Sequence, residues 1–183
     1  MDMKFMIASD IHGSAYYCEK LLEAYKREEA DRLFLLGDIL YHGPRNDLPK
    51  GYDPKAVISM LNNMKEEILC VRGNCDTEVD QMVLEFPVLA DYAILPVENK
   101  LLYATHGHVY NKENPPKMMK GDILLNGHFH VPALEELEGF IYLNPGSVSI
   151  PKENSQHSYM IFEENTFVWK NLDGDEYLRT VIE

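Results

Sequence analysis

Short apolar runs that end in glycine and a small polar residue recur along the first half of this chain of 183 residues. Residues 4–9, 33–36 and 68–71 form such runs, and each has the length and composition of a buried strand. Between them, residues 14–29 and 53–64 carry apolar side chains at helical spacing. The order strand, helix, strand, helix, strand predicts right-handed crossovers and a largely parallel sheet.

The second half of the chain has a different pattern. A series of short strand candidates is separated in many places by glycine, asparagine and proline turns; they are residues 88–97, 101–105, 123–125, 133–136, 140–143, 159–162, 166–170 and 177–182. Two sheets packed face to face, with helices outside, would accommodate both halves. No repeat or flexible linker marks a boundary, so we expect residues 1–183 to form a single domain.

Charge and composition exclude several classes of protein. The formal net charge of −13 repels long polyanions, so we expect no nucleic-acid polymer as a partner, whereas cations bound to the protein would still admit a small phosphate ester. No apolar stretch is long enough to span a bilayer, so we expect no membrane association. Residues 1–4 lack the features of a signal peptide, and Cys18, Cys70 and Cys75 lack disulfide spacing, which together favour a cytoplasmic protein.

Side chains that can bind metals follow the predicted strands. In chain order the candidate ligands are Asp10, His12, Asp38, Asn74, His106, His128 and His130. Because ligands of α/β sheets bind at the carboxyl ends of strands, these residues are expected to converge although they are far apart in sequence. Imidazole, carboxylate and amide oxygen are ligands of borderline divalent metals. Each motif alone also fits an ordinary turn, but the whole series predicts a metal site.

The series resembles the motif set of the calcineurin-like metallophosphoesterases, namely Asp10-x-His12, Gly37-Asp38, Gly73-Asn74, His106 and Gly127-His128-x-His130. The resemblance extends to the YfcE-like phosphodiesterase branch of this superfamily. That branch shares residues 42–46 (HGPRN), 72–76 (RGNCD), 79–82 (VDQM) and 144–149 (NPGSVS). The similarity covers about residues 4–152 and implies a four-layer αββα sandwich of two mixed β-sheets flanked by helices.

By this resemblance, the chain is a dinuclear metal-dependent phosphoric diester hydrolase that acts on small phosphodiesters. One metal would be held by Asp10, His12, Asp38 and His130, and the other by Asp38, Asn74, His106 and His128. Similar enzymes favour Mn²⁺, with iron, zinc, nickel or cobalt as alternatives. Asp38 would bridge the two metals, and a water between them would lose its proton near neutral pH and attack phosphorus.

Two further residues are candidates for catalytic roles. Cys75 stands where most of the superfamily carries a histidine, and its thiol could protonate the leaving group or could only leave space beside the metals. His108 could bind the substrate phosphate or support His106. Arg45 could pair with phosphate or lie free on the surface, and Phe129 could shape the pocket.

Other functions stay open at this point. A phosphomonoesterase is disfavoured by Cys75, because a thiol is a poorer general acid than an imidazolium group. A retromer subunit of the same fold works as a non-catalytic scaffold with an eroded metal site, whereas this chain keeps every ligand position. A metal-storage protein is disfavoured because an open bridging site is a poor cage. Relatives form dimers or larger assemblies, so kinship also suggests a homo-oligomer.

Overall fold

The computed structural model describes residues 3–183. Residues 1 and 2, part of the segment 1–4 that was compared with a signal peptide, lie outside the described residues. The strands are β1 (Phe5–Ala8), β2 (Arg32–Leu35), β3 (Ile68–Cys70), β4 (Ala93–Val97), β5 (Lys100–Ala104), β6 (Asp122–Leu125), β7 (Pro132–Leu137), β8 (Phe140–Pro145), β9 (Ser158–Glu163), β10 (Thr166–Asn171) and β11 (Glu176–Val181). The helices are α1 (Ala15–Glu28), α2 (Pro54–Asn62), the 3₁₀ helix η1 (Lys65–Glu67) and α3 (Glu78–Val83).

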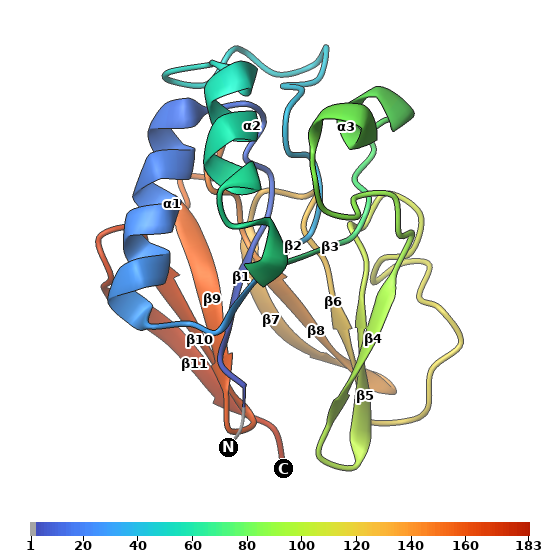
Figure 1. Ribbon diagram of the computed structural model, residues 1–183. Helices are drawn as coiled ribbons and strands as arrows, with labels where there is room; N and C mark the ends of the chain where they lie inside the picture. The colour runs from blue at the N-terminus through green and yellow to red at the C-terminus, as the bar shows by residue number, and fades with distance from the viewer. Residues whose placement is uncertain (1–2) are drawn as a thin grey trace.

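Two mixed sheets form the centre of the fold (Figure 1). The six-stranded sheet has the order β11-β10-β9-β1-β2-β3, in which β1, β2 and β3 run parallel, as the first half of the sequence predicts. The five-stranded sheet has the order β4-β5-β6-β8-β7, with β5, β6 and β8 parallel. The expected α/β sandwich of two mixed sheets is therefore confirmed.

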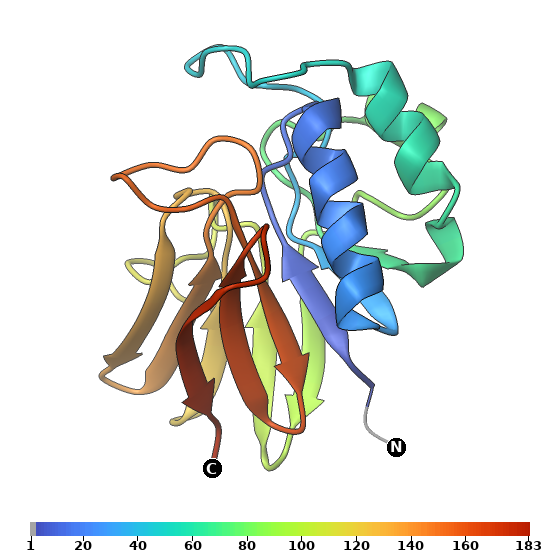
Figure 2. The same cartoon turned by 90° about the vertical axis from the view of Figure 1, so that its left-hand side faces the viewer.

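Each face of the six-stranded sheet covers a separate apolar core. Met6, Leu33 and Leu35 point toward α1 and α2 and pack on Leu21 and Leu61 of those helices. The opposite face carries Ile7, Phe34 and Trp169, which pack against Ile123 and Leu143 of the five-stranded sheet. Figure 2 shows α1 and α2 lying against one side of the six-stranded sheet, with the other sheet behind it. Successive side chains of these buried strands therefore pack alternately into the helix layer and into the other sheet.

A long loop passes over the outer face of the five-stranded sheet. Lys112 in this loop forms an ion pair with Glu135 of β7, and its ammonium group lies 5.5 Å from the ring centroid of Tyr142 on β8. The helices α1 and α2 thus form one outer layer of the sandwich, and the loop of residues 107–121 covers part of the other.

The two longer helices begin directly after side chains that cap them. Ser14 caps α1 by accepting a hydrogen bond from the backbone N–H of Tyr17, and Asp53 caps α2 in the same way through Ala56. Pro54 occupies the first position of α2, where a missing N–H costs nothing. Within the described range, every helix is too short or too polar to cross a membrane.

Two local predictions differ from the structure. The strand expected over residues 88–97 begins only at Ala93, because the backbone N–H of Val88 is taken by the side chain of Gln81. The short helix α3 is absent from the predicted elements. Its capping box, formed by Thr77 and Asp80, is present in the sequence, but the helix is too short to show an apolar period.

Candidate metal centre

The candidate ligands leave the carboxyl ends of strands in both sheets, as predicted. In the six-stranded sheet β1, β2 and β3 are followed by Asp10, His12, Asp38 and Asn74, and in the five-stranded sheet β5 and β6 are followed by His106, His128 and His130. The structure brings these residues together into two adjoining groups. We call Asp10, His12 and His130 the first group, and Asp38, His106, His128 and Asn74 the second group.

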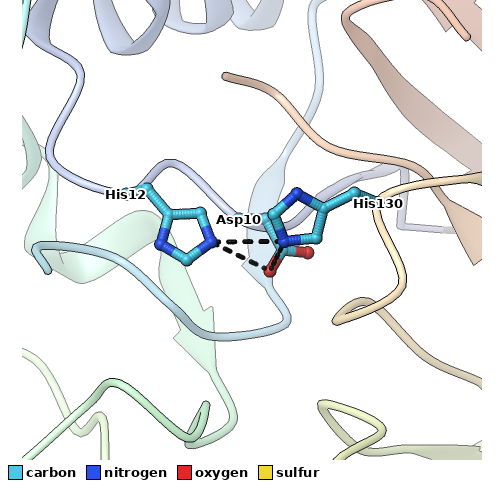
Figure 3. Close-up of side chains that lie close together, drawn as sticks. All are labelled: Asp10, His12 and His130. Carbon is cyan, nitrogen blue, oxygen red and sulfur yellow. Dashed lines mark hydrogen bonds and ion pairs between the residues drawn. The ribbon is translucent and has the colours of Figure 1, made fainter. Parts of the chain in front are cut away.

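The first group is compact and fully buried. His130 Nε2 lies 3.2 Å and His12 Nε2 lies 3.5 Å from Asp10 Oδ1, and the two imidazole nitrogens are 3.3 Å apart. Figure 3 shows the two rings turning their nitrogens toward each other and toward the carboxylate. No more than 3% of any of these residues is exposed. The first group therefore presents three ligand atoms to one point.

The second group is built around His106. Its Nε2 lies 3.4 Å from Asp38 Oδ2, 3.1 Å from Asn74 Oδ1 and 3.2 Å from His128 Nδ1. His106 is buried, whereas His128 is half-buried and Asn74 is exposed. The second group thus opens toward solvent on the side of Asn74.

Asp38 of the second group also faces the first group. Its Oδ2 is 3.4 Å from His106 Nε2 and 3.7 Å from His12 Nε2, so a single oxygen faces an imidazole of each group. Its Oδ1 accepts a hydrogen bond of 2.8 Å from the backbone N–H of Cys75. This arrangement is what a carboxylate shared by two neighbouring cations requires.

Backbone carbonyls fix the orientation of three imidazoles. Nδ1 of His12 lies 2.7 Å from the carbonyl of Tyr41, and Nδ1 of His106 lies 2.6 Å from that of Leu36. His130 makes the same contact with Ile150 over 2.6 Å. Because a carbonyl can only accept, each Nδ1 donates to it, and each Nε2 is the ring nitrogen that faces the group and could bind a cation. Such a second contact is typical of metal-binding histidines.

The backbone is left-handed at most of the candidate ligands. Positive φ values occur at Asp10 (60°), His12 (48°), Asp38 (54°), His128 (63°) and His130 (61°). Residues with a Cβ adopt this conformation at a cost of about 1–2 kcal/mol each, and only where the surroundings impose it. Backbone hydrogen bonds impose it here, since His12 N–H donates to the carbonyl of Asp38 over 2.9 Å. Strain of this kind concentrates at functional sites.

Glycines beside the ligands allow the loops to approach each other. A Cβ at Gly73 would lie 2.1 Å from Asp38 Oδ1, and a Cβ at Gly127 would lie 1.9 Å from Ser9 Oγ and 3.0 Å from Asp10 Oδ2. Any other residue at these positions would push the carboxylates out of place. The glycines that accompany the ligand motifs in the sequence are therefore required by this close approach.

Burial and charge act against each other throughout the site. Burial opposes the charge of Asp10, but close contacts with His12 and His130 outweigh it and hold the pKa of Asp10 well below its usual range. Burial also opposes a charge on His106, yet Asp38 raises the pKa of His106 to about 9. Burial and repulsion by His106 lower the pKa of His128 to about 4. Opposed shifts within one buried cluster are typical of functional sites.

The first group has the donor chemistry of a cation site. Asp10 Oδ1 is fully buried and forms no hydrogen bond within the described residues, although two imidazole nitrogens lie within 3.5 Å of it. An unpaired buried carboxylate oxygen is costly. A divalent cation placed among these atoms would satisfy the oxygen and both lone pairs, so the residues present fit a metal.

The structure places the other predicted residues differently. Cys75 lies in the cleft beside His12 and Asp38, with its ligand atom within 4.8 Å of theirs. His108 is exposed, with its ring centroid 6.3 Å from that of His128, and it does not line this cleft. Its catalytic role stays a prediction. Cys18 and Cys70 are buried in the core, as expected.

Residues that support the site were assigned no such role from the sequence. Asp76 accepts hydrogen bonds from the backbone N–H groups of Asp38 and Gly73 and so holds the second group. Ser147 and Ser149 both donate to the carbonyl of Asp10. Asp76 and both serines lie in segments that the branch motifs include, but their partners become visible only in the fold. Lys152 lines the cleft, and no sequence motif pointed to it.

Comparison with known proteins identifies the family. The model of the calcineurin-like phosphoesterase superfamily domain matches residues 3–166. The chain therefore belongs to the calcineurin-like phosphoesterase superfamily. Within it, the chain is 45% identical to phosphodiesterase YfcE of Escherichia coli over 89% of this chain and 89% of that protein. A solved structure of this E. coli phosphoesterase has a TM-score of 0.94 at 42% identity and covers 99% of this chain and 100% of its own.

A more distant structure shares only the fold. Vps29 of Entamoeba histolytica, solved in complex with zinc, has a TM-score of 0.65 at 20% identity over 99% of this chain. At that identity, the similarity extends to the arrangement of the sheets and carries no functional conclusion. The predicted resemblance to the YfcE-like branch is confirmed by the higher identity and structural agreement with YfcE.

Proposed function

We propose that this protein is a phosphodiesterase that hydrolyses small phosphodiesters with the help of two divalent cations, Mn²⁺ being the expected metal. The observation that carries the proposal is the position of Asp38, whose Oδ2 faces an imidazole of both groups. The printed function of the E. coli relative, a phosphodiesterase, supports the same reaction. The first group would hold one cation and the second group the other, with Asp38 shared by both.

The chain's own residues prepare the reaction. When bound, two cations would supply an activated water as nucleophile and would neutralise charge on the phosphoryl oxygens. Asp38 sets the spacing of the two groups, and the carbonyls of Tyr41, Leu36 and Ile150 keep the imidazoles aimed at them. Because the loops are held by many backbone contacts, little reorganisation is needed when substrate binds.

Cys75 favours diesters with good leaving groups. Burial and the nearby carboxylate of Asp38 raise the pKa of the Cys75 thiol. The thiol is therefore a weak acid that gives an alkoxide leaving group little help, whereas an aryl oxide leaves without a proton. This argument supports activated aryl esters over alkyl esters, and the printed function of the E. coli relative supports diesters over monoesters. The complete ligand set argues against the scaffold alternative.

Domain organisation and location remain proposals as well. Ligands come from both sheets, which supports one domain over residues 1–183. Cys18, Cys70 and Cys75 are free thiols, which fits a reducing compartment such as the cytoplasm. Assembly into a homo-oligomer is an expectation from kinship alone.

Two measurements test the proposed function together. Purified protein is analysed for bound metals, and the same preparation is assayed with Mn²⁺ on bis(para-nitrophenyl) phosphate and on para-nitrophenyl phosphate. We expect about two divalent cations per chain, in line with two-metal sites, and faster hydrolysis of the diester. Metal-replete protein that hydrolyses neither ester would contradict the proposal, and faster hydrolysis of the monoester would favour the phosphomonoesterase.

A further inference from the structure

Two cationic side chains line the cleft beside the candidate metal centre, and the proposed hydrolysis leaves both without a role. Arg45 and Lys152 form part of the wall of a cleft of about 340 Å³ that also contains His12, Asp38 and His128. Clefts of about 300–1,000 Å³ accommodate ligands considerably larger than a phosphate group. We call this cleft, including the side chains of Arg45 and Lys152, the metal cleft.

Arg45 is carried by a turn that lies beside Cys75. Asn46 closes the turn by donating from Nδ2 to the carbonyl of His42 over 2.8 Å, and its N–H donates to Gly43 over 3.3 Å. Gly43 has φ of +80°, and a Cβ built on it would lie 3.4 Å from the sulfur of Cys75. The backbone that carries Arg45 is therefore fixed close to Cys75, which lines the same cleft as Asp38.

Lys152 is fixed on the side of the first group. Its backbone N–H donates to the carbonyl of His130 over 3.0 Å, and the hydroxyl of Ser155 donates to the carbonyl of Lys152 over 2.6 Å. His130 in turn donates from Nδ1 to the carbonyl of Ile150. The loop that positions a candidate metal ligand thus also brings a lysine to the edge of the metal cleft.

Neither Arg45 nor Lys152 forms an ion pair with a carboxylate of the described residues. Within residues 3–183, the lysine and arginine side chains in ion pairs are Lys4, Lys65, Arg72, Lys112, Lys170 and Arg179. These are six of the 17 basic residues, so an unpaired basic side chain is not unusual by itself, and what sets Arg45 and Lys152 apart is that both line one cleft. Two unpaired basic side chains at one cleft of a protein with a net charge of −13 form a local concentration of positive charge, which attracts anions.

The scissile group alone does not account for these charges. A phosphodiester carries one negative charge, and the two cations of the proposed centre already exceed the charge of Asp10 and Asp38. Arg45 and Lys152 lie at the rim, where they would face the part of the substrate beyond the reacting phosphorus. Phe129, which is 41% exposed, offers an apolar face in the same cleft.

We propose that Arg45 and Lys152 bind a second anionic group of the substrate, a phosphate or a carboxylate, outside the scissile phosphodiester. The preferred substrate is then a small phosphodiester that carries one further anion on its second alcohol. This inference rests on the proposed phosphodiesterase activity and defines the substrate class of the same site.

The test uses para-nitrophenyl phosphodiesters that differ only in the second alcohol, which is methoxyethyl, carboxyethyl or phosphoethyl. In each, water oxygen forms the new bond to phosphorus, the bond to the aryl oxygen breaks, and nitrophenolate and a proton are released. Nitrophenolate reports cleavage of the diester alone, and free Mn²⁺ is held constant. We expect KM for an anionic ester to be about tenfold lower than for the neutral one, the usual effect of a charge-assisted contact, with kcat little changed.

The double variant Arg45→Gln/Lys152→Gln is expected to remove this preference and bring the KM values of the three esters together. Lys50→Gln is the matched control, because Lys50 lies in the same loop with its ammonium group 3.7 Å from the Tyr16 ring centroid and away from the metal cleft. It should keep the full preference. Calorimetric binding of the product of the phosphoethyl ester, ethylene glycol bisphosphate, should weaken about tenfold in the double variant.

The outcomes separate the two proposals. A preference for the phosphoethyl ester alone supports a phosphate-specific rim, and equal gains for both anionic esters support recognition of charge. Hydrolysis of all esters without a preference, or a preference that the double variant keeps, overturns this inference but not the phosphodiesterase. If metal-loaded protein hydrolyses none of the esters, the proposed function itself fails.

Discussion

The two groups of the candidate metal centre differ in depth and in support. In the first group Asp10, His12 and His130 are almost wholly buried, and carbonyls orient both imidazoles. In the second group Asn74 is exposed and His128 is half-buried, so solvent reaches one side. A buried site with oriented ligands releases its metal slowly, whereas an open site exchanges metal and admits substrate. If each group binds a cation as proposed, the first group should hold its cation more tightly than the second.

Removing the carboxylate of Asp38 should abolish metal binding in both groups. Asp38→Asn is expected to lose both cations and to lower activity on the aryl diester by about a thousandfold or more, because one charge serves both sites. Asparagine tolerates the positive φ of position 38 and can still accept the hydrogen bond from Cys75. Metal analysis and diester hydrolysis give the readout.

A matched comparison with Asp38→Ala separates charge from backbone strain. Alanine also removes the charge but adds the strain of a left-handed backbone, so it should lose the same metals and be less stable. Half of the normal activity in either variant, or the loss of a single metal, would show that Asp38 is not shared.

Single-ligand variants should separate the groups. We expect Asn74→Ala to weaken the cation of the second group by about 10–100-fold while the first group keeps its metal, since the amide is exposed and contributes one oxygen. His130→Asn should weaken the first group, because asparagine tolerates the left-handed backbone but is too short to replace the imidazole. Metal content after graded dialysis against a chelator measures both.

The order in which the cations are lost shows whether the two groups behave as separate sites. In Asn74→Ala, the cation of the second group should leave at a low chelator concentration while the cation of the first group stays bound. In His130→Asn, the cation of the first group should be the one that is weakened. Identical release curves for the two variants would mean that the groups act as one site and that their difference in burial has no effect on metal retention.

A histidine at position 75 should change the ratio of monoester to diester hydrolysis. Cys75→His is expected to raise hydrolysis of para-nitrophenyl phosphate roughly tenfold to a hundredfold relative to the diester, because an imidazolium group adds a positive charge beside the phosphoryl oxygens, where the monoester carries one more negative charge than the diester. Cys75→Ser is the control, since a hydroxyl has a similar size and is no better as an acid. An unchanged ratio of diester to monoester rates in Cys75→His would mean that Cys75 only leaves space.

The sequence predicts the ligand set well because chemistry and topology agree. Asp10, Asp38 and Asn74 each follow an apolar run, and parallel strands bring their ends together whatever the separation in sequence. The motif order therefore carries the site without any knowledge of loop shape. The left-handed backbone at Asp10 and His128 was not predictable in this way, since it is uncommon even for aspartate and histidine, which adopt it more often than most residues.

Loops mark the limit of what the sequence predicts. Arg45 and Lys152 reach the metal cleft through turns whose course depends on contacts with His42 and His130. His108 is separated from His106 only by Gly107, and the sequence does not predict whether its ring faces the cleft. In the structure it lies outside the cleft lining. The start of β4 at Ala93 and the helix α3 were missed for the same reason, because tertiary contacts of Gln81 and a short capping box decide them.

A substitution far from both groups should change stability and leave the metals in place. Glu28 at the end of α1 accepts hydrogen bonds from Tyr159 over 2.7 Å and from Lys170 over 2.8 Å, and these contacts tie α1 to β9 and β10. Burial opposes the charge, but Lys170 and Tyr159 outweigh it and lower the pKa of Glu28 from its usual 4.5. The folded state therefore gains stability above pH 4.5 and loses it as pH falls through the lower, folded-state pKa.

Glu28→Gln should lower the unfolding free energy at neutral pH by about 1 kcal/mol, and this deficit should shrink on acidification. Denaturant melts of wild type, Glu28→Gln and the exposed control Glu23→Gln on the same helix measure it, with metal content followed alongside. A deficit that is constant with pH would mean that packing, rather than the charge of Glu28, holds α1 to the sheet. Loss of metal in this variant would show that metal retention follows overall stability and not the local difference between the two groups.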